Sequence, residues 1–199
     1  MRYTGLIFIL LVPYTAWHFL SDRPVSHSPG VLVVDDPKQV EILSARTIEH
    51  EGAQLQPHAT FVARARVLSR ERYRIGKMAE VAPLDIAVGW GRMSDTDVLQ
   101  GLDISQSNRF YFWHYDDEPP IPIDEIVKHS ANWHLIPANS LVWRTLDGLR
   151  EGDVVSLEGK LVDVETSEEG LIRTSLTRDD AGPGACEIIL VESAYREPR

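Results

Sequence analysis

Two hydrophobic patterns divide the chain. Residues 5–20 form a largely apolar run without a charged residue, apart from the titratable His18. Beyond residue 60, apolar and polar positions alternate, as in FVARARVL at residues 61–68. Alternation with a period of two places one set of side chains on the buried face of a β-strand and the other on its solvent face. The chain is therefore expected to consist of an apolar N-terminal segment and a β-rich domain.

The apolar run approaches the thickness of a bilayer, since helical residues 5–20 would span roughly 24 Å at about 1.5 Å each. We expect residues 1–23 to form an uncleaved signal-anchor, a single transmembrane helix in the cytoplasmic membrane. Arg2 on the short N-terminal side places the remaining chain in the periplasm by the positive-inside rule. The alternatives are a buried core helix and a protein secreted after cleavage, for which Ser26–Ser28 is the best recognition site although Pro29 follows it.

Residues 24–59 are expected to form an extended linker or arm. Residues 21–39 contain three prolines and several turn formers, which disfavour regular structure. GVLVV at residues 30–34 is apolar enough to dock as a short strand. The folded domain is then expected to cover residues 60–199.

Within this domain the pattern predicts short strands separated by short helices. Ser94, Pro122 and Asn139 are typical of helix starts, and Gly148 is typical of a helix end. The expected helices cover residues 94–102, 122–131 and 139–149, and the expected strands cover residues 61–68, 85–93, 108–115, 151–165, 171–177 and 186–194. Short strands with interposed helices are typical of a small barrel, so the expected fold is mainly β with short α-helices.

One strand pattern has a counterpart in a known fold. GDVVSLEGKLVDVE at residues 152–165 resembles the long curved strand of OB-fold barrels, where a glycine lets one strand serve two faces of the sheet. Gly159 is the corresponding glycine and is expected at a β-bulge. SH3-like and other small barrels share this pattern. The resemblance implies a small OB-like barrel, preceded here by the N-terminal membrane helix.

Longer stretches resemble a set of short, uncharacterised proteobacterial proteins with one N-terminal hydrophobic segment. The stretches that carry this resemblance cover most of the chain from Arg23 onward: RPVSHSPGVL, VGWGRMSD, ISQSNRFYFWHY, HSANWHLIPAN and SLTRDDAGPGACE. The resemblance implies an anchor followed by a domain in the bacterial envelope, and it implies no catalytic residue.

Charge and cysteine content narrow the range of functions. The formal net charge of -10 makes nucleic acid an unlikely partner, because domains that neutralise phosphates are usually basic. The single cysteine, Cys186, excludes an intramolecular disulfide and a four-cysteine zinc site. No cofactor is expected.

HSANWHLIPAN at residues 129–139 combines side chains that bind metals and ligands. His129 and His134 are five residues apart, which separates them by about 140° on one helix, whereas a zinc-binding helix needs a spacing of four. A loop that gathered them with His114 would form a metal site. The favoured interpretation is a helix end followed by a turn, in which Asn132 satisfies backbone groups. A ligand pocket is the remaining alternative.

Cys186 is the second candidate. A cysteine nucleophile needs a nearby base, usually histidine, to become a thiolate near neutral pH. The position of Cys186 at the start of an apolar run favours a buried, inert thiol instead. Residues 179–184, just before it, have the composition of a hairpin connection.

A basic stretch is unusual in so acidic a chain. Its arginines all have even numbers, so they line one face if the segment stays extended. Such a face suits an anionic headgroup, a glycan or an acidic partner. The favoured alternative is a solvated face paired with acids such as Glu158, and a turn near Ser69 would divide it. The arginines are Arg64, Arg66, Arg70, Arg72 and Arg74.

The expected strand at residues 108–115 is rich in aromatic residues. Alternation places Phe110 and Phe112 on one face and Tyr111 and Trp113 on the other. One face is expected to lie in the core. The other is expected to pack beneath a helix or, alternatively, to form a platform for carbohydrate or peptide, with Trp113 as a ligand-binding residue.

These patterns predict a membrane-anchored bacterial envelope protein, in the first place a non-enzymatic module for binding or scaffolding. Its expected partners are the cytoplasmic membrane, through residues 5–20, and an envelope protein or anionic ligand. One alternative is an envelope hydrolase that uses His129 and His134 or Cys186. Another is an anion- or nucleic-acid-binding OB module that uses the arginine face.

Overall fold

The protein is mainly β, as the alternating pattern predicts. The computed structural model describes residues 23–177 and 186–198, with 46% of residues in strands and 16% in helices. The expected membrane helix at residues 1–23, apart from Arg23, and the expected hairpin connection at residues 179–184 lie outside the described residues. In the described part of the chain, no helix combines the length and apolarity needed to cross a membrane.

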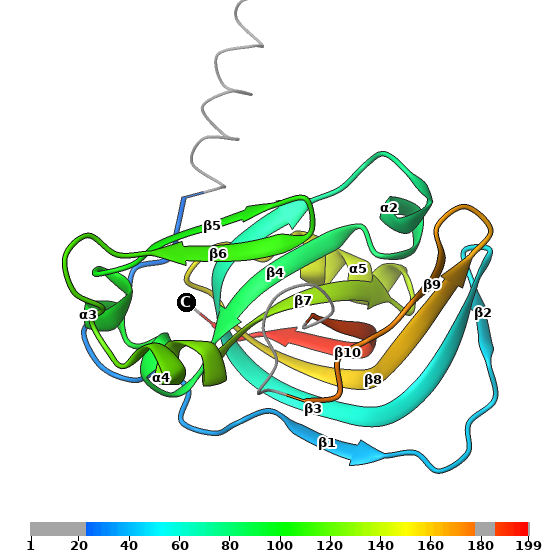
Figure 1. Ribbon diagram of the computed structural model, residues 1–199, viewed down its shortest axis with the longest axis horizontal. Coiled ribbons are helices and arrows are strands. Elements are labelled where there is room, and N and C mark those ends of the chain that lie inside the picture. The colour runs from blue at the N-terminus through cyan, green and yellow to red at the C-terminus, as the bar shows by residue number, and fades with distance from the viewer. Residues whose placement is uncertain (1–22, 178–185, 199) are drawn as a thin grey trace, which may run out of the picture.

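Among the described residues, five strands form a closed ring (Figure 1). In order around the ring they are β3 (Ala53–Arg72), β4 (Leu84–Gly89), β7 (Ser130–Pro137), β10 (Glu187–Arg196) and β8 (Val154–Thr166). Neighbours run antiparallel except β7 and β10, which run parallel. The ring closes because β3 is long enough to pair first with β8 and then with β4.

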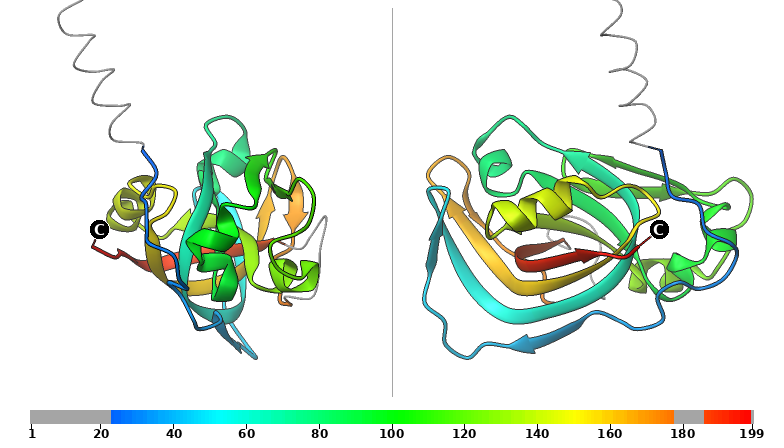
Figure 2. Two further views of the ribbon diagram at one scale, coloured as in Figure 1. Left: turned by 90° about the vertical axis from the view of Figure 1, so that its left-hand side faces the viewer. Right: turned by 180° about the vertical axis from the view of Figure 1, so that it is seen from behind.

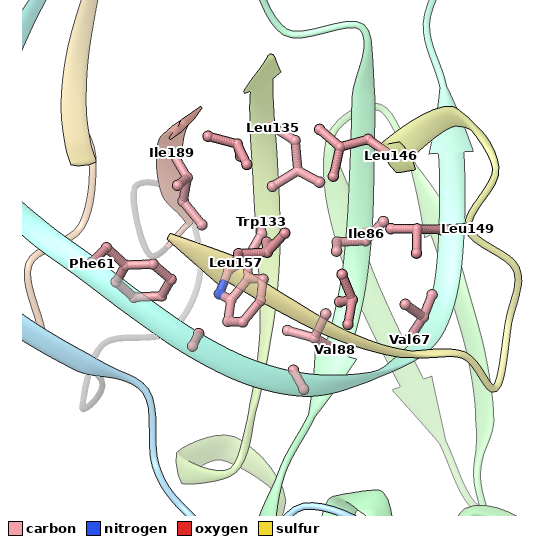
Figure 3. Packing of buried hydrophobic residues seen from close by; sticks show 14 of the residues in the cluster. Phe61, Val67, Ile86, Val88, Trp133, Leu135, Leu146, Leu149, Leu157 and Ile189 are labelled. Carbon is pink, nitrogen blue, oxygen red and sulfur yellow. The ribbon is translucent and has the colours of Figure 1, made fainter. Parts of the chain in front are cut away.

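Side chains from all the ring strands fill its interior (Figure 3). Phe61 and Trp133 meet edge to face, with ring centroids 5.4 Å apart. Ile86, Leu157 and Ile189 belong to the same cluster, and each of these five residues is at most 1% exposed. Removal of apolar surface from water, at about 25 cal/mol per Å², makes this cluster the main source of stability.

Short helices surround the ring. Those in the described part of the chain are α2 (Lys77–Val81), the 3-10 helix η1 (Gly91–Ser94), α3 (Thr96–Leu99), α4 (Ile123–Lys128) and α5 (Ser140–Asp147). Figure 2 shows α5 beside the ring, where Val142 and Leu146 join the core. The predicted cap of α5 is confirmed, because the Asn139 side chain accepts hydrogen bonds from two backbone N–H groups at 3.0 Å each.

Further strands lie outside the ring. β1 (Lys38–Glu41) and β2 (Ile48–His50) pair with β3, and β9 (Gly170–Ile172) pairs with β8. β5 (Asp103–Ser107) and β6 (Phe110–His114) form a separate hairpin.

The expected arm at residues 24–59 lies along the ring and contributes to it. It supplies β1, β2 and the start of β3. Val33 is fully buried in the main core cluster. The GVLVV stretch docks without forming a strand, because the backbone of Leu32 and Val33 donates hydrogen bonds to the Ser94 hydroxyl instead.

The predicted helix end and turn at residues 129–139 are wrong for most of that stretch. Ser130–Pro137 forms β7, which lies between β4 and β10. Trp133 enters the core, while Asn132 and His134 alternate to the outer face of the ring. A strand covered on both faces lacks a clear apolar and polar alternation, so its pattern is easily taken for a turn.

Three smaller predictions also change. Asp95, not Ser94, caps α3, because the Ser94 hydroxyl is occupied by the arm. The strand expected at residues 171–177 is limited to β9. The bulge expected at Gly159 lies instead on the partner strand β10, where the register shifts between Val191 and Ser193. Glycine is still required at position 159, because an added Cβ would lie 2.1 Å from the Leu190 carbonyl oxygen.

Candidate functional site

The pairing of β4, β7 and β10 gathers polar side chains on the outer face of the ring. Asp85 is the Cα partner of His134 across β4 and β7, and His134 is the Cα partner of Ile188 across β7 and β10. The neighbouring residues Ile86 and Trp133 face the core. Because side chains alternate along a strand, Asp85 and His134 point to the opposite side.

Asp85 lies between two cationic partners. Its side chain is 0% exposed, and its Oδ2 lies 2.8 Å from Nδ1 of His134. Its Oδ1 accepts a hydrogen bond from Nη1 of Arg109 at 2.9 Å. A buried carboxylate is tolerated in a fold only when it is paired in this way, so the three side chains form one unit.

Arg109 reaches Asp85 from the tip of the β5–β6 hairpin. Asn108 and Arg109 have φ values of 52° and 67°, as expected for a two-residue turn with both residues left-handed. The Arg109 guanidinium lies 4.0 Å from the centroid of the Tyr73 ring, and the backbone N–H of Arg109 donates to the Tyr73 hydroxyl at 2.8 Å. Asn132 donates from Nδ2 to the Arg109 carbonyl at 3.0 Å, which ties the hairpin tip to β7.

Cys186 lies next to this unit, immediately before β10. The Cys186 side chain lines the same cavity as His134 and lies near enough to its imidazole to influence its charge. Sγ of Cys186 lies 3.9 Å from Nδ2 of Asn132. The structure therefore aligns a thiol, an imidazole and a carboxylate that are far apart in the sequence.

The partners of His134 control its charge. Deep burial by itself lowers its pKa, but the neighbouring Asp85 carboxylate and Cys186 side chain more than offset this and raise the pKa to about 9. His134 is therefore an imidazolium at neutral pH. An imidazolium beside a cysteine favours the thiolate, which is the nucleophilic form.

A cavity of about 170 Å³ opens on Cys186 and His134. Its other walls are mostly apolar, with Arg109, Glu169 and Arg173 as the charged residues of the lining. The apolar lining comes from Met78, Phe110, Ile172 and Ile188. A small organic group that enters it would meet the thiol.

Two of the histidines expected at a site lie elsewhere. His129 contacts the carbonyl of Glu125 through Nδ1 at 3.0 Å and lies 4.0 Å from Asp36 through Nε2. His114 ends β6, where it pairs with Asp103. Among residues 23–177 and 186–198, no group of three or more His, Cys, Asp or Glu side chains is arranged to hold a metal ion.

A register shift between Val67 and Ser69 divides the arginine face. Before the shift, Arg64 and Arg66 point outward, whereas Arg70 and Arg72 lie on the side of the core residues Ile86 and Leu84. The expected single stripe is therefore not formed.

The arginines before and after the register shift have different partners. Arg64 binds Glu197 through Nε and Nη2 at 2.5 and 2.9 Å. Arg70 and Arg72 lie 3.8 and 2.9 Å from Asp147 on α5. Arg74 follows the end of β3 and is exposed.

The aromatic hairpin has one packed face and one exposed face. Tyr111 and Trp113 are half-buried against the third core cluster, so Trp113 belongs to the packed face. Phe110 and Phe112 are 40% and 51% exposed, and Phe110 lines the cavity beside Cys186.

Asp85 and Arg109 are the site residues that the sequence pattern missed. The available signal was a carboxylate inside the apolar strand LDIAVG, where all six residues are buried. No protein-family model, curated protein or solved structure matches the chain. The site is therefore interpreted from its own geometry.

Proposed function

We propose that the protein is a cysteine-dependent acyl-transfer enzyme of the hydrolase class. Cys186 is the nucleophile, His134 is the general base and Asp85 orients His134. The observation that carries this proposal is the placement of Cys186 and His134 at one cavity, with Nδ1 of His134 2.8 Å from Oδ2 of the fully buried Asp85. A nucleophile, a base and an orienting group in hydrogen-bond contact are the common arrangement of nucleophilic catalysis.

The reaction proceeds in two balanced steps. The Cys186 thiolate attacks the carbonyl carbon of an ester, thioester or amide, and the leaving group departs with the proton of the His134 imidazolium. His134 then removes a proton from water, which attacks the thioester and releases the carboxylic acid. This step restores the Cys186 thiolate and the His134 imidazolium. Asn132 Nδ2, near Sγ, supplies a donor for the oxyanion of each tetrahedral intermediate.

The site favours the hydrolase over a purely binding module. A binding surface does not require a thiol and an imidazolium to be in contact. A binding surface also does not require a fully buried carboxylate next to the imidazolium, as Asp85 is here, because a carboxylate is costly to bury. The same arrangement argues against the inert thiol that the sequence favoured.

The location and fold family remain part of the proposal. We place residues 5–20 in the cytoplasmic membrane and the ring in the periplasm, on the strength of the apolar run and Arg2. We also assign the ring to the OB-like barrels, supported by its five strands and by the long curved β3, which pairs on both sides.

Thiol reactivity of the full-length protein tests this function. Because Cys186 is the single cysteine, iodoacetamide labelling followed by mass spectrometry reports on it alone. We expect rapid labelling of the native protein, together with hydrolysis of short-chain nitrophenyl esters. His134→Gln should reduce both by about 10²-fold or more, as loss of a general base does, and His129→Gln should change neither. A Cys186 that reacts only after unfolding would refute the enzyme and leave a binding module.

A further inference from the structure

A second cavity, of about 350 Å³, lies apart from Cys186. It is enclosed by β3, by the segment from α3 to β5, by the turn before β8 and by the arm at Val25. Its size is within the range of small-molecule sites. The side chains that matter for its chemistry are Arg66, Asp103 and Glu151, with Leu99 and Leu102 as apolar walls.

Arg66 brings a buried positive charge to this cavity. The residue is 7% exposed, and Nη1 donates to the Ser94 carbonyl and to Oγ1 of Thr96, both at 2.9 Å. Both acceptors are neutral. Among the described residues, no carboxylate forms an ion pair with Arg66, and its buried Nε has no hydrogen-bond partner.

A buried guanidinium that no carboxylate contacts directly is costly, because burial penalises the charged form. Burial accordingly lowers the pKa of Arg66 below its ordinary value, against the opposing charges of Glu151 and Asp95. Other arginines on β3 avoid this cost by pairing with Glu197 or Asp147. The cavity beside Arg66 thus has the features of a site for an anionic group.

The two carboxylates that line the cavity restrict which anion fits. Glu151 and Asp103 contribute negative charge to the same space as Arg66. A phosphate with two charges would be repelled by both. A monocarboxylate that also carries an ammonium group would satisfy Arg66 at one end and the acids at the other.

We infer that this cavity binds a small zwitterion of the free amino-acid type. Its carboxylate would take the guanidinium of Arg66, and its ammonium group would lie toward Glu151 and Asp103. The side chain of the amino acid would contact Leu99 and Leu102. This site is independent of the proposed chemistry at Cys186.

The arm is part of this cavity. Val25 donates its backbone N–H to the Glu151 carbonyl at 2.8 Å, and His27 Nε2 lies 2.7 Å from the Gly152 carbonyl. An added Cβ at Gly152 would lie 2.0 Å from the Val25 carbonyl oxygen, so glycine is required for the arm to close the wall. Occupation of the cavity is therefore expected to stabilise the arm against the ring.

Titration calorimetry and thermal unfolding of the full-length protein test the inference. The probes are the free amino acids, with acetate, ethylamine and inorganic phosphate as partial ligands. We expect at least one amino acid to bind and raise Tm, and each partial ligand to bind at least about tenfold more weakly. No binding of any amino acid at millimolar concentration would overturn the inference, and so would phosphate or acetate binding as tightly as the amino acid.

Substitutions locate the site. Arg66→Met should weaken amino-acid binding at least about tenfold. Arg64→Met is the matched control, since it lies on the same face of β3 and is paired with Glu197 at the surface. Glu151→Gln should weaken amino-acid binding without weakening acetate binding, and it keeps the test decisive if Arg66→Met does not fold. If Arg66→Met and Arg64→Met lost the same amount of amino-acid affinity, the ligand would bind outside this cavity.

Discussion

Asp85 and His134 are direct partners across two antiparallel strands, and their side chains meet at 2.8 Å on the side of the ring away from the core. A strand pair rather than a loop therefore positions the proposed base. Strand pairing restricts both side chains to a narrow range of positions, which suits a group that must face one sulfur atom.

Loss of the Asp85 charge is expected to destabilise the fold strongly. Asp85→Asn would leave His134 and Arg109 without their shared counter-ion, and breaking a buried pair typically costs about 3–5 kcal/mol. Urea unfolding monitored by tryptophan fluorescence measures this. Asp124→Asn is the control, because its pair with Lys128 is exposed and worth at most about 0.5 kcal/mol. A similar loss of unfolding free energy in both variants would contradict a stabilising role for the buried Asp85 carboxylate.

Stability should fall as pH rises through the titration of His134. The pKa of His134 is raised to about 9 in the fold, from an ordinary value of 6.5. A raised pKa contributes stability that is fully present below pH 6.5 and is lost as pH rises through about 9. The contribution is roughly 3 kcal/mol at 1.36 kcal/mol per pKa unit.

Unfolding free energies measured between pH 6 and pH 10 check this dependence. In His134→Gln, the unfolding free energy should no longer show the part of the pH dependence that comes from titration of the imidazole. Parallel curves for the two proteins over this window would show that His134 is not charged in the fold.

Gly159→Ala should destabilise β8 against β10. The added Cβ would lie 2.1 Å from the Leu190 carbonyl oxygen, and backbone cannot move aside as a flexible side chain can. Overpacking of this kind costs about 1–3 kcal/mol. Chemical denaturation should show this loss, whereas Ser156→Ala on the same strand should change little. A neutral Gly159→Ala would mean that the two strands separate more easily than their pairing indicates.

Removal of the cap on α5 should cost about 1 kcal/mol. Asn139→Ala deletes the oxygen that accepts the backbone N–H groups of Leu141 and Val142. The loss should appear in the midpoint of urea unfolding. Asn139→Asp, which keeps an acceptor at the helix N-terminus, should retain most of the stability, and an equal loss in both variants would exclude capping as the cause.

The sequence by itself determined the features that depend on local physics. Alternation at residues 61–68 is sufficient to indicate a strand, because the pleat repeats every two residues. Asn139 and Gly148 mark the ends of α5 because capping is satisfied by neighbouring residues. The mainly β class follows from such elements taken together.

Only the tertiary structure decided where the functional groups meet. β7 shows little alternation because it is covered on both faces, so HSANWHLIPAN did not look like a strand. The contact of His134 with Asp85 and Cys186 depends on the register of three strands that are distant in the sequence. A shift by one residue in any of them would turn its side chain into the core. Local patterns do not determine the register of distant strands, which is set by the packing of the whole ring.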